Sequence, residues 1–252
     1  MKTAVISGGA GGLGRALSTA LQARDWRVVL IDLDISGLEQ SETQIAMACD
    51  LTRPDALRAT ADQIMERCDS IDMVIYNAGI THIGGFDHSD DDSHRKVFEI
   101  NYFAAVAMAR AFLPAIRQAQ GTHLAISSVA GFTPLFHRTA YAASKHALEG
   151  FFKSLRSEER PHGVRVHIAA PSFVATNIGN DQRQADGTAR PGSATDGVDY
   201  MTPKDAVDEI LRGVDRNRSM IPVGRIARAA WWVNRLSPDL YQRLMERKID
   251  GH

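Results

Sequence analysis

Residues 3–24 read TAVISGGAGGLGRALSTALQAR and join three kinds of local structure. Thr3–Ser7 is short and apolar, as a buried β-strand is, and Gly8–Gly14 follows as a glycine-rich turn. Apolar residues then recur at helical spacing up to Arg24. Strand, turn and helix together form the phosphate cradle of a dinucleotide-binding fold, because glycines let the backbone approach a pyrophosphate and the helix N-terminus supplies free N–H groups. A flexible glycine loop is the alternative, and the flanking strand and helix argue against it.

The next strand places an acidic side chain beside this turn. Val28–Ile31 is a strand candidate that ends in Asp32. A carboxylate about 20 residues past the glycines can accept hydrogen bonds from the hydroxyls of an adenosine ribose. An ordinary strand-end aspartate is the alternative, and the strand–turn–helix context favours the ribose contact.

Strands and helices continue to alternate along the chain. Further strand candidates are 45–48, 73–76, 122–126, 165–170 and 220–223, and the helix candidates are 54–67, 93–119 and 202–217. We expect Thr52 and Thr202 to cap helices that carry Pro54 and Pro203 in their first turns. The repeated β–α units predict an α/β fold, in which residues 1–252 form a single domain with a doubly wound parallel sheet and helices on both faces.

Composition restricts the class of protein. A length of 252 residues with 44% hydrophobic side chains is ample for one large core, and a net charge of -1 gives no electrostatic case for nucleic acid. Two cysteines, Cys49 and Cys68, are no disulfide framework and fit a reducing compartment. Met1 is close to the first strand, so we expect no signal peptide, and Arg110 interrupts the most apolar run, Ala104–Ile116. We therefore expect a cytoplasmic protein.

A tyrosine and a lysine four residues apart are the candidate acid/base pair. On a helix, Tyr141 and Lys145 would share one face. A free tyrosine titrates near ~10, and a fixed cation nearby lowers that pKa, so the pair could exchange a proton with an alcohol or a carbonyl oxygen. The spacing alone is common and does not prove a function. Ser128 strengthens the case, because a strand-end serine and a helix tyrosine can converge at the carboxyl edge of the sheet.

Motifs in register along nearly the whole chain resemble the short-chain dehydrogenase/reductase family, in its compact single-domain branch. Ser7-Gly8-x-x-x-Gly12-x-Gly14 resembles the family's Thr-Gly-x-x-x-Gly-x-Gly, with Ser7 in place of threonine. Tyr76-Asn77-Ala78-Gly79 resembles the family's Asn-Asn-Ala-Gly, with Tyr76 in place of the first asparagine. Pro171-Ser172-Phe173-Val174-Ala175-Thr176 resembles Pro-Gly-x-Val-x-Thr, with Ser172 in place of glycine. The family's catalytic tetrad is matched in order and spacing by Asn101, Ser128, Tyr141 and Lys145.

The resemblance implies a role for each member of the tetrad. Tyr141 is the general acid/base, and Lys145 lowers its pKa and binds the nicotinamide ribose. Ser128 hydrogen-bonds the substrate oxygen, and Asn101 orders a water that links Lys145 to solvent. Ser127 is the alternative serine, and the spacing to Tyr141 favours Ser128.

The resemblance also implies a dinucleotide contact surface that spans the motifs. It comprises Ser7, Gly8, Gly12, Leu13, Gly14, Asp32, Asp50, Leu51, Asn77, Ala78, Gly79, Tyr141, Lys145, Pro171, Val174 and Thr176. We expect NAD rather than NADP, because the Asp32 carboxylate would repel a 2′-phosphate. Gly11 stands where NADP-preferring relatives often carry Arg or Lys, and we expect Arg15 to serve the helix face.

A polar loop and a set of apolar residues indicate how the substrate would be bound. Asn177–Met201 is polar and irregular, which predicts a substrate lid. No pair of basic residues obviously clamps an acid, so we expect an apolar secondary alcohol or ketone, steroid-like or lipid-like. The histidines at 82, 88, 94 and 137 lack metal-ligand spacing, and no metal is expected. The apolar residues that flank the catalytic motifs are Ile80, Ile83, Phe132, Pro134, Leu135, Phe136 and Phe173.

Residues 225–252 predict two amphipathic helices, the second starting at Ser237-Pro238. They carry Trp231 and Trp232, and their basic residues outnumber their acidic ones. Such a pair can cap the pocket, lie at a subunit interface or lie on a membrane surface. We favour packing on the domain over peripheral membrane contact, and we expect a homodimer or homotetramer.

The function predicted from these features is reversible, NAD-linked oxidation of a secondary alcohol to a ketone. A non-catalytic regulatory protein that binds the dinucleotide is the first alternative, and an intact tetrad argues against it. A sugar-nucleotide epimerase of the same superfamily is the second, and the chain is short for the additional substrate domain.

Overall fold

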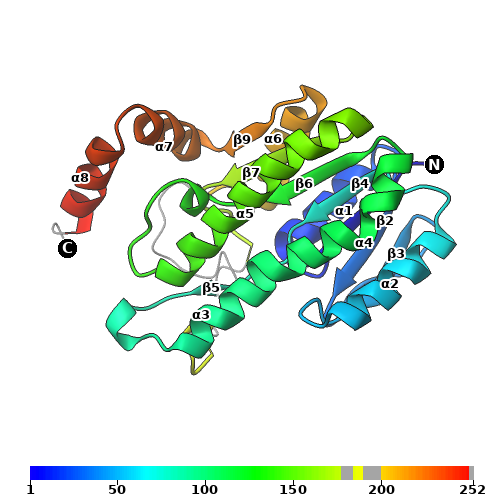
Figure 1. Ribbon diagram of the computed structural model, residues 1–252, viewed down its shortest axis with the longest axis horizontal. Helices are drawn as coiled ribbons and strands as arrows, with labels where there is room; N and C mark the ends of the chain where they lie inside the picture. The colour runs from blue at the N-terminus through cyan, green and yellow to red at the C-terminus, as the bar shows by residue number, and fades with distance from the viewer. Residues whose placement is uncertain (177–183, 190–199, 250–252) are drawn as a thin grey trace.

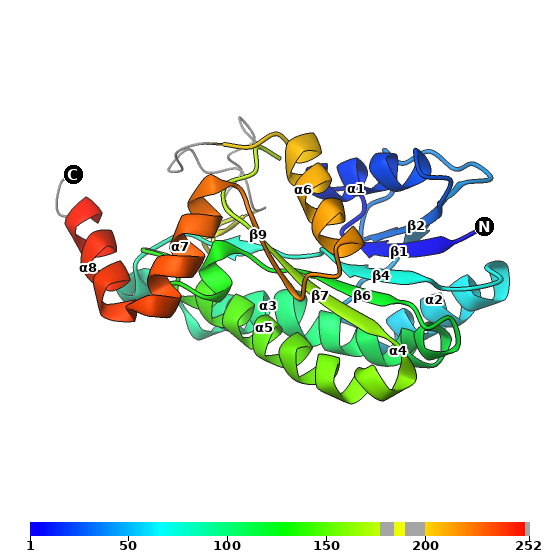
Figure 2. The same ribbon diagram turned by 90° about the horizontal axis from the view of Figure 1, so that it is seen from above.

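The computed structural model describes residues 1–176, 184–189 and 200–249. Most of the lid predicted over Asn177–Met201 therefore lies outside the described residues. The remaining chain forms a Rossmann-like α/β fold, in which one parallel sheet lies between two layers of helices (Figures 1 and 2).

The central sheet has seven strands in the order β3-β2-β1-β4-β6-β7-β9, and every pair is parallel. The chain builds outward from β1 to β3 and then returns to β4 on the other side of β1, so the strand order reverses between β1 and β4. Ligands of open α/β sheets bind at such a reversal, outside the carboxyl ends of the strands. The strands are β1 (Thr3–Ser7), β2 (Arg27–Asp32), β3 (Gln44–Ala48), β4 (Met73–Tyr76), β6 (Thr122–Ile126), β7 (Arg165–Pro171) and β9 (Met220–Val223).

Helices cover both faces of the sheet, which confirms the predicted fold class. Figure 2 shows α1 (Gly12–Gln22) and α6 (Pro203–Asp215) on one side of the sheet. On the other side lie α2 (Pro54–Arg67), α4 (Ala104–Gln118) and α5 (Thr139–Glu159). Each layer has its own buried apolar cluster, to which alternate residues of the strands contribute. The strands read as continuous apolar runs because both of their faces are buried.

The helix predicted over 93–119 is one continuous helical stretch with an irregular centre. It consists of α3 (Asp91–Phe98), a π-helical turn (Glu99–Phe103) and α4. By length and composition the stretch Asp91–Gln118 could cross a bilayer, as core helices of globular proteins also could. Met108, Phe112 and other residues of its inner side are buried against the sheet, so we assign it to the core.

The two predicted helix caps have different outcomes. The hydroxyl of Thr202 accepts a hydrogen bond from the backbone N–H of Asp205 and caps α6, as expected. The prediction that Thr52 caps α2 is wrong. Arg53 is the N-cap residue of α2, and its side chain makes no capping hydrogen bond. The backbone N–H and hydroxyl of Thr52 instead donate to the Asp50 carboxylate, which is the stronger acceptor nearby.

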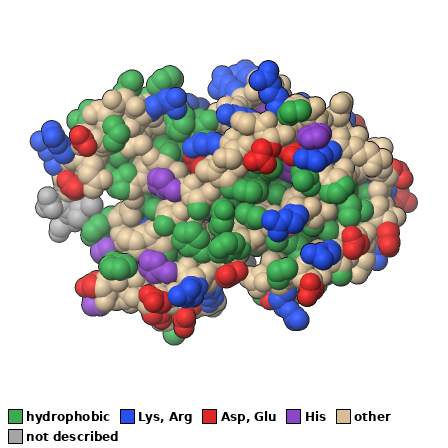
Figure 3. Space-filling model, in the orientation of Figure 1, with side chains coloured by type: hydrophobic (Ala, Val, Ile, Leu, Met, Phe, Trp, Pro, Cys, Tyr) green, Lys and Arg blue, Asp and Glu red, His purple; other side chains and the backbone are tan. Residues whose placement is uncertain are grey.

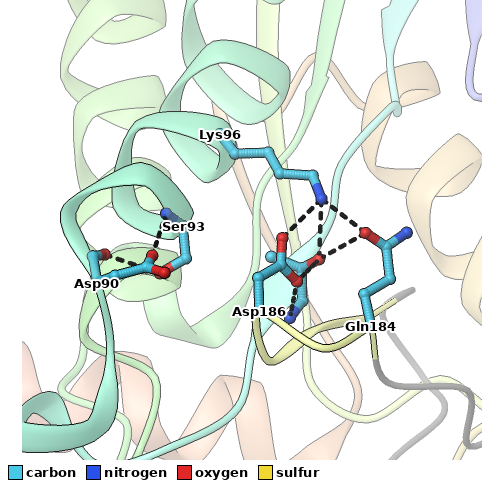
Figure 4. A network of polar contacts seen from close by, with 6 residues as sticks. Asp90, Ser93, Lys96, Gln184 and Asp186 are labelled. Atoms are coloured by element: carbon cyan, nitrogen blue, oxygen red, sulfur yellow. Dashed lines mark hydrogen bonds and ion pairs between the residues drawn. The ribbon is translucent and has the colours of Figure 1, made fainter.

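The sequence missed a second, small sheet. Here β5 (Thr81–His82) pairs antiparallel with β8 (Thr188–Ala189), more than a hundred residues later. Lys96 of α3 fastens the same segment by donating to Gln184 at 2.6 Å and to Asp186 at 2.8 Å (Figure 4). Partial burial would raise the pKa of Asp186, but the bonds from Lys96 and Thr188 hold it at about 2. The segment is thereby held beside the loop that follows β4.

A buried polar pair interrupts the apolar core between β4 and β6. The Tyr76 hydroxyl lies 2.6 Å from Nδ1 of His123, and Phe152 packs against both rings. Nε2 of His123 has no hydrogen-bond partner within the described part of the chain. Burial lowers the pKa of His123 to about 4, against a smaller opposing effect of the Glu159 charge. The folded protein therefore holds this ring neutral.

We predict that acid destabilises the fold through His123. Between about pH 6.5 and pH 4 the unfolded chain binds a proton here that the folded chain does not, so the free energy of unfolding decreases as pH decreases. The full effect of the difference in pKa is about 3 kcal/mol. Urea unfolding at several pH values should show a smaller acid loss in the double variant Tyr76→Phe/His123→Leu, which leaves no partner unpaired.

The matched control is His162→Asn, because that histidine is exposed. It should keep the parent's loss of stability below pH 6.5. Equal acid sensitivity of the parent and the double variant would contradict the assignment.

Candidate active site

The glycine-rich turn is pressed against two other motifs so closely that side chains are excluded. A Cβ on Gly8, whose φ is +65°, would lie 2.9 Å from Cα of Ala78. A Cβ on Gly12 would lie 2.9 Å from the carbonyl oxygen of Thr176. The structure therefore gathers three predicted contact motifs, around 7–14, 77–79 and 171–176, at the carboxyl edge of the sheet. Glycine at these positions allows the turn to pack against the other two motifs, at the edge of the sheet where open α/β folds bind their ligands.

Ser7 and Asn77 hold this junction together. The Ser7 hydroxyl donates to the carbonyl of Ile75 at 3.3 Å and accepts from the N–H groups of Asn77 and Ala78 at 3.0 and 3.1 Å. The Asn77 amide donates in return to the carbonyls of Ser7 and Gly8, both at 3.0 Å. Serine therefore does the bonding that the resemblance assigns to threonine.

The first turn of α1 fits an anionic group. No side chain caps this helix end, so its first N–H groups and the positive end of the helix dipole are left for a ligand. Asp32 lies beside it, where its carboxylate accepts from the N–H groups of Ala10 at 2.9 Å and Leu33 at 2.8 Å. A carboxylate has about four acceptor sites, so Asp32 keeps capacity for ribose hydroxyls.

The expectation for Arg15 is wrong. Its guanidinium turns back from α1 and donates to the carbonyls of Ala10 at 2.9 Å and Gly37 at 2.8 Å. The carbonyls of the tight turn have no helix to bond, and a long planar donor at the first turn reaches them. Arg15 consequently fastens the glycine turn to the loop after β2, close to Asp32.

A small cavity lies between the ends of β1 and β4, the π turn and the start of α4. Ile100 is among its walls, and the sequence did not mark it as a contact, although it directly precedes Asn101. Asp50 lies nearby in sequence, and hydrogen bonds from Thr52 hold its pKa below the usual value. The cavity is lined by Ser7, Leu51, Tyr76, Ala78, Ile100, Asn101, Ala104, Ala105 and Met108.

Tyr141 and Ser128 meet as the spacing predicted. Ser128 precedes a short 3-10 turn (Val129–Gly131) and accepts from the N–H of Ala130 at 3.2 Å. Burial raises the pKa of Tyr141, while a hydrogen bond with Ser128 and the charge of Arg138 lower it. Arg138, at the start of α5, was not predicted as a site residue. Ser127 faces away and donates to Glu149, so Ser128 is the serine at the tyrosine.

Lys145 lies one turn along α5 from Tyr141 and is buried. Its ammonium donates to the carbonyl of Ile126 at 2.9 Å and lies 5.8 Å from the centre of the Tyr141 ring. Burial lowers the pKa of Lys145 to about 8, and the negative charge of Glu149 opposes that shift. A Cβ on Gly79 would lie 3.1 Å from Oδ1 of Asn101, a tight contact, and 3.5 Å from the Lys145 ammonium, so the loop at 77–79 lies against both side chains.

Asn101 belongs to the π turn and ties three segments together. Its amide donates to the carbonyl of Ile80 and to the hydroxyl of Ser144, both at 2.9 Å, and accepts from the N–H of Ile80 at 2.8 Å. Single π turns inside α-helices are frequent at functional sites. Both amide hydrogens are used, so contact of Asn101 with a water would run through one of its oxygens.

Glu149 is a buried charge that sequence reasoning missed. It accepts from the Ser127 hydroxyl at 2.9 Å and pairs with Lys153 at 2.7 Å. A Cβ on Gly131 would lie 2.4 Å from its carboxylate, so Glu149 also shapes the turn after Ser128. The sequence could have indicated this residue, because Glu149 lies four positions after Lys145 and therefore on the same face of α5.

The two C-terminal helices approach the site from one side. They are α7 (Arg225–Leu236) and α8 (Pro238–Ile249), with the bounds predicted to within a few residues. Trp231 stacks edge-on against Phe132 with ring centres 5.1 Å apart, and Val129 packs in the same cluster. The expected packing of the tail near the pocket is therefore confirmed.

Known proteins share both the sequence pattern and the fold. The family model for short chain dehydrogenase matches residues 2–187. Dehydrogenase/reductase SDR family member 7B of Bos taurus is 32% identical over 257 residues, which cover 96% of this chain and 79% of the relative. A short chain dehydrogenase of Burkholderia cenocepacia in complex with NADP superimposes with a TM-score of 0.84 at 22% identity, covering 96% of both chains. A Burkholderia phymatum short chain dehydrogenase/reductase in complex with NAD gives 0.76 at 21% identity, covering 87% of this chain and 88% of the other.

We predict that Glu149 sets the alkaline limit of catalysis. Glu149→Gln keeps the shape of the side chain and removes the charge that raises the pKa of Lys145. Lys145 should then lose its proton at lower pH, and the alkaline limb of the kcat–pH profile should move down by about one pH unit.

Two matched variants separate the charge from the hydrogen bond. Ser127→Ala removes the bond alone and should leave the alkaline limb in place, whereas Glu149→Asp should move it less than Glu149→Gln does. An unchanged limb in Glu149→Gln would contradict the electrostatic role.

Proposed function

The chain belongs to the short-chain dehydrogenase family of oxidoreductases, and from that premise we propose that it interconverts a secondary alcohol and a ketone. The observation that carries this proposal is the meeting of Ser128, Tyr141 and Lys145 at the carboxyl edge of the sheet, beside an uncapped helix N-terminus. When bound, a nicotinamide dinucleotide supplies or accepts the hydride, and the protein supplies position and electrostatics.

The side chains divide the proton chemistry among themselves. The Ser128 hydroxyl holds the substrate oxygen and stabilises charge that develops on it. Tyr141 takes the proton of the alcohol during oxidation and returns it during reduction. The Lys145 ammonium is proposed to favour the phenolate by its charge. The hydrogen bond with Ser128 and the charge of Arg138 already offset part of the rise in the Tyr141 pKa that burial causes. Asn101 ties the loop after β4 to α5 through its bonds to Ile80 and Ser144, the residue before Lys145.

The substrate is proposed to be an apolar alcohol or ketone. Support comes from the cluster next to Ser128, in which Phe132 and Val129 pack against Trp231 of α7. An apolar wall of this kind gains free energy by covering hydrocarbon. A steroid-like or lipid-like molecule meets that description.

NAD is the proposed cofactor, on the strength of Asp32. Two unit charges ~4 Å apart repel by roughly 1 to 4 kcal/mol between water-like and surface-like dielectrics, which disfavours a 2′-phosphate beside the carboxylate. Arg15 lies close to the loop after Asp32, and its positive charge would attract a 2′-phosphate. Its guanidinium, however, is hydrogen-bonded to two backbone carbonyls. The carboxylate therefore decides the preference.

We further propose a cytoplasmic homodimer or homotetramer. Cys49 and Cys68 are free and buried, which suits a reducing compartment. Phe103, on the outer side of the π turn, is 50% exposed and offers apolar surface to a second copy.

Tyr141→Phe tests the proton transfer. The variant should lower kcat by about 10²–10⁴-fold, because phenylalanine keeps the ring and removes the acid/base. Cofactor affinity, measured by titrating NADH fluorescence, should change little. Tyr241→Phe on α8 is the matched control and should retain turnover. Near-normal kcat in Tyr141→Phe would sink the proposed role.

Asp32→Ala tests the cofactor preference. The parent's kcat/KM should favour NAD over NADP by roughly five-fold to nearly a thousand-fold, and the variant should lose most of that ratio. Asp34→Ala removes a neighbouring carboxylate of the same loop and should keep the parent's ratio. Equal or better use of NADP by the parent would overturn the assignment.

A further inference from the structure

The outward sides of α7 and α8 expose large apolar side chains. Trp232 is 62% exposed, Leu236 80%, and Leu240 and Leu244 each 49%. These are four of the nine large hydrophobic side chains that are exposed within the described residues, and they lie within thirteen consecutive positions. Nothing in the described part of the chain covers them.

Each helix carries an apolar stripe on its outward side. Trp232 and Leu236 are four residues apart on α7, and Leu240 and Leu244 are four apart on α8, so each pair forms a stripe along its helix. The opposite side of α7 packs on the body of the protein through Ala227 and other buried residues. The outward stripe of α7 is therefore not needed to hold that helix in place.

Arginines alternate with these apolar residues on the same outward side. The exposed positions of α7 include Arg225, Arg228, Trp232 and Arg235, spaced by three or four residues as one helix face requires. Those of α8 include Leu240, Arg243, Leu244 and Arg247, which share a face by the same rule, and also the acidic Asp239 and Glu246.

Basic residues outnumber acidic ones in the two C-terminal helices. Residues 225–249 contain six Lys or Arg and two Asp or Glu, whereas the whole chain has 29 against 30. Helix α7 has no acidic residue. Arg228 is paired with Glu209 at 3.2 Å and Arg235 lies 5.5 Å from the Trp231 ring, but Arg225, Arg243 and Arg247 make no ion pair within the described residues.

A second copy of the chain fits this surface poorly. A two-fold interface presents the same patch from both subunits, so it would bury these arginines against one another. Burying an unpaired guanidinium is costly, and charged residues are depleted at the centre of protein interfaces. An anionic lipid surface has the complementary charge, and it accepts Trp and Leu at the boundary between headgroups and acyl chains.

The shape of the molecule allows contact with a flat surface. Figures 1 and 2 show α7 and α8 at one end of the molecule, with α8 projecting beyond the sheet. Hydrophobic and basic side chains lie next to each other at this end in Figure 3. We propose that the outward sides of α7 and α8 bind the surface of an anionic lipid bilayer as a peripheral anchor.

The anchor lies next to the proposed substrate site. The inner side of α7 contacts Phe132 through Trp231, in the cluster that adjoins Ser128. If the proposed function holds, an apolar substrate would pass from the lipid to the site over a short path. The membrane contact itself does not depend on catalysis.

Vesicle binding by the full chain tests the proposal. The parent should sediment with vesicles of phosphatidylcholine and phosphatidylglycerol, bind vesicles of phosphatidylcholine alone much more weakly, and lose affinity as salt screens the charges. Arg243→Ser/Arg247→Ser should lower the partition coefficient on anionic vesicles by roughly 30-fold, at about 1 kcal/mol for each arginine. Trp232→Ser/Leu236→Ser should lower binding in both lipid mixtures.

Matched controls test whether weaker vesicle binding comes from unfolding or from a lower net charge of the whole protein. Arg58→Ser/Arg156→Ser removes two exposed arginines from α2 and α5 and should bind anionic vesicles as the parent does. Thermal unfolding should show that all variants fold. A parent that ignores anionic vesicles would overturn the proposal. So would Leu240→Ser/Leu244→Ser if it dissociated an oligomer while vesicle binding stayed unchanged, because the face would then be a contact between copies.

Discussion

The three hydrogen bonds of the Ser7 hydroxyl are the constraint on which the site depends. They join the end of β1 to the end of β4, at the position where the strand order reverses. With that junction closed, Gly8 touches Ala78, and the uncapped N-terminus of α1 faces the loop that leads to Asn101. Without it, the glycine turn and the catalytic helix would be two separate motifs on one sheet.

The site also shows how the fold accommodates buried charge. Burial disfavours the charged forms of Tyr141, Lys145 and Glu149, as the direction of each pKa shift indicates. Each group has a compensating partner: Ser128 for the tyrosine, the carbonyl of Ile126 for the lysine, and Ser127 with Lys153 for the glutamate. Such networks are costly when incomplete, so in the proposed mechanism Ser127, Glu149 and Lys153 influence the proton transfer at Tyr141 without touching the substrate.

The C-terminal helices present two different surfaces on opposite sides. Their inner residues complete an apolar wall around Phe132, and their outer residues form the arginine-rich apolar surface proposed to meet lipid. The first role needs close packing and the second needs solvent exposure, and a helix can satisfy both because its faces are independent. Substitutions on the inner side should therefore change the packing around Phe132, and substitutions on the outer side should change the proposed lipid binding, each without the other.

The sequence alone determined the seven strands, four of the five covering helices, the Thr202 cap and the meeting of Ser128 with Tyr141, because period, spacing and chain order report local geometry. The extent of α5 came only from the structure. Only the tertiary structure decided contacts between distant segments: the pairing of Thr81–His82 with Thr188–Ala189, the bond from Ser127 to Glu149, and the turn of Arg15 toward Gly37. Two-residue strands have no period to detect, and a long side chain near a helix start has many acceptors within reach. The cap predicted at Thr52 failed for the same reason. Its hydroxyl donates to the Asp50 carboxylate and does not cap α2, and which of the two contacts forms depends on the final geometry.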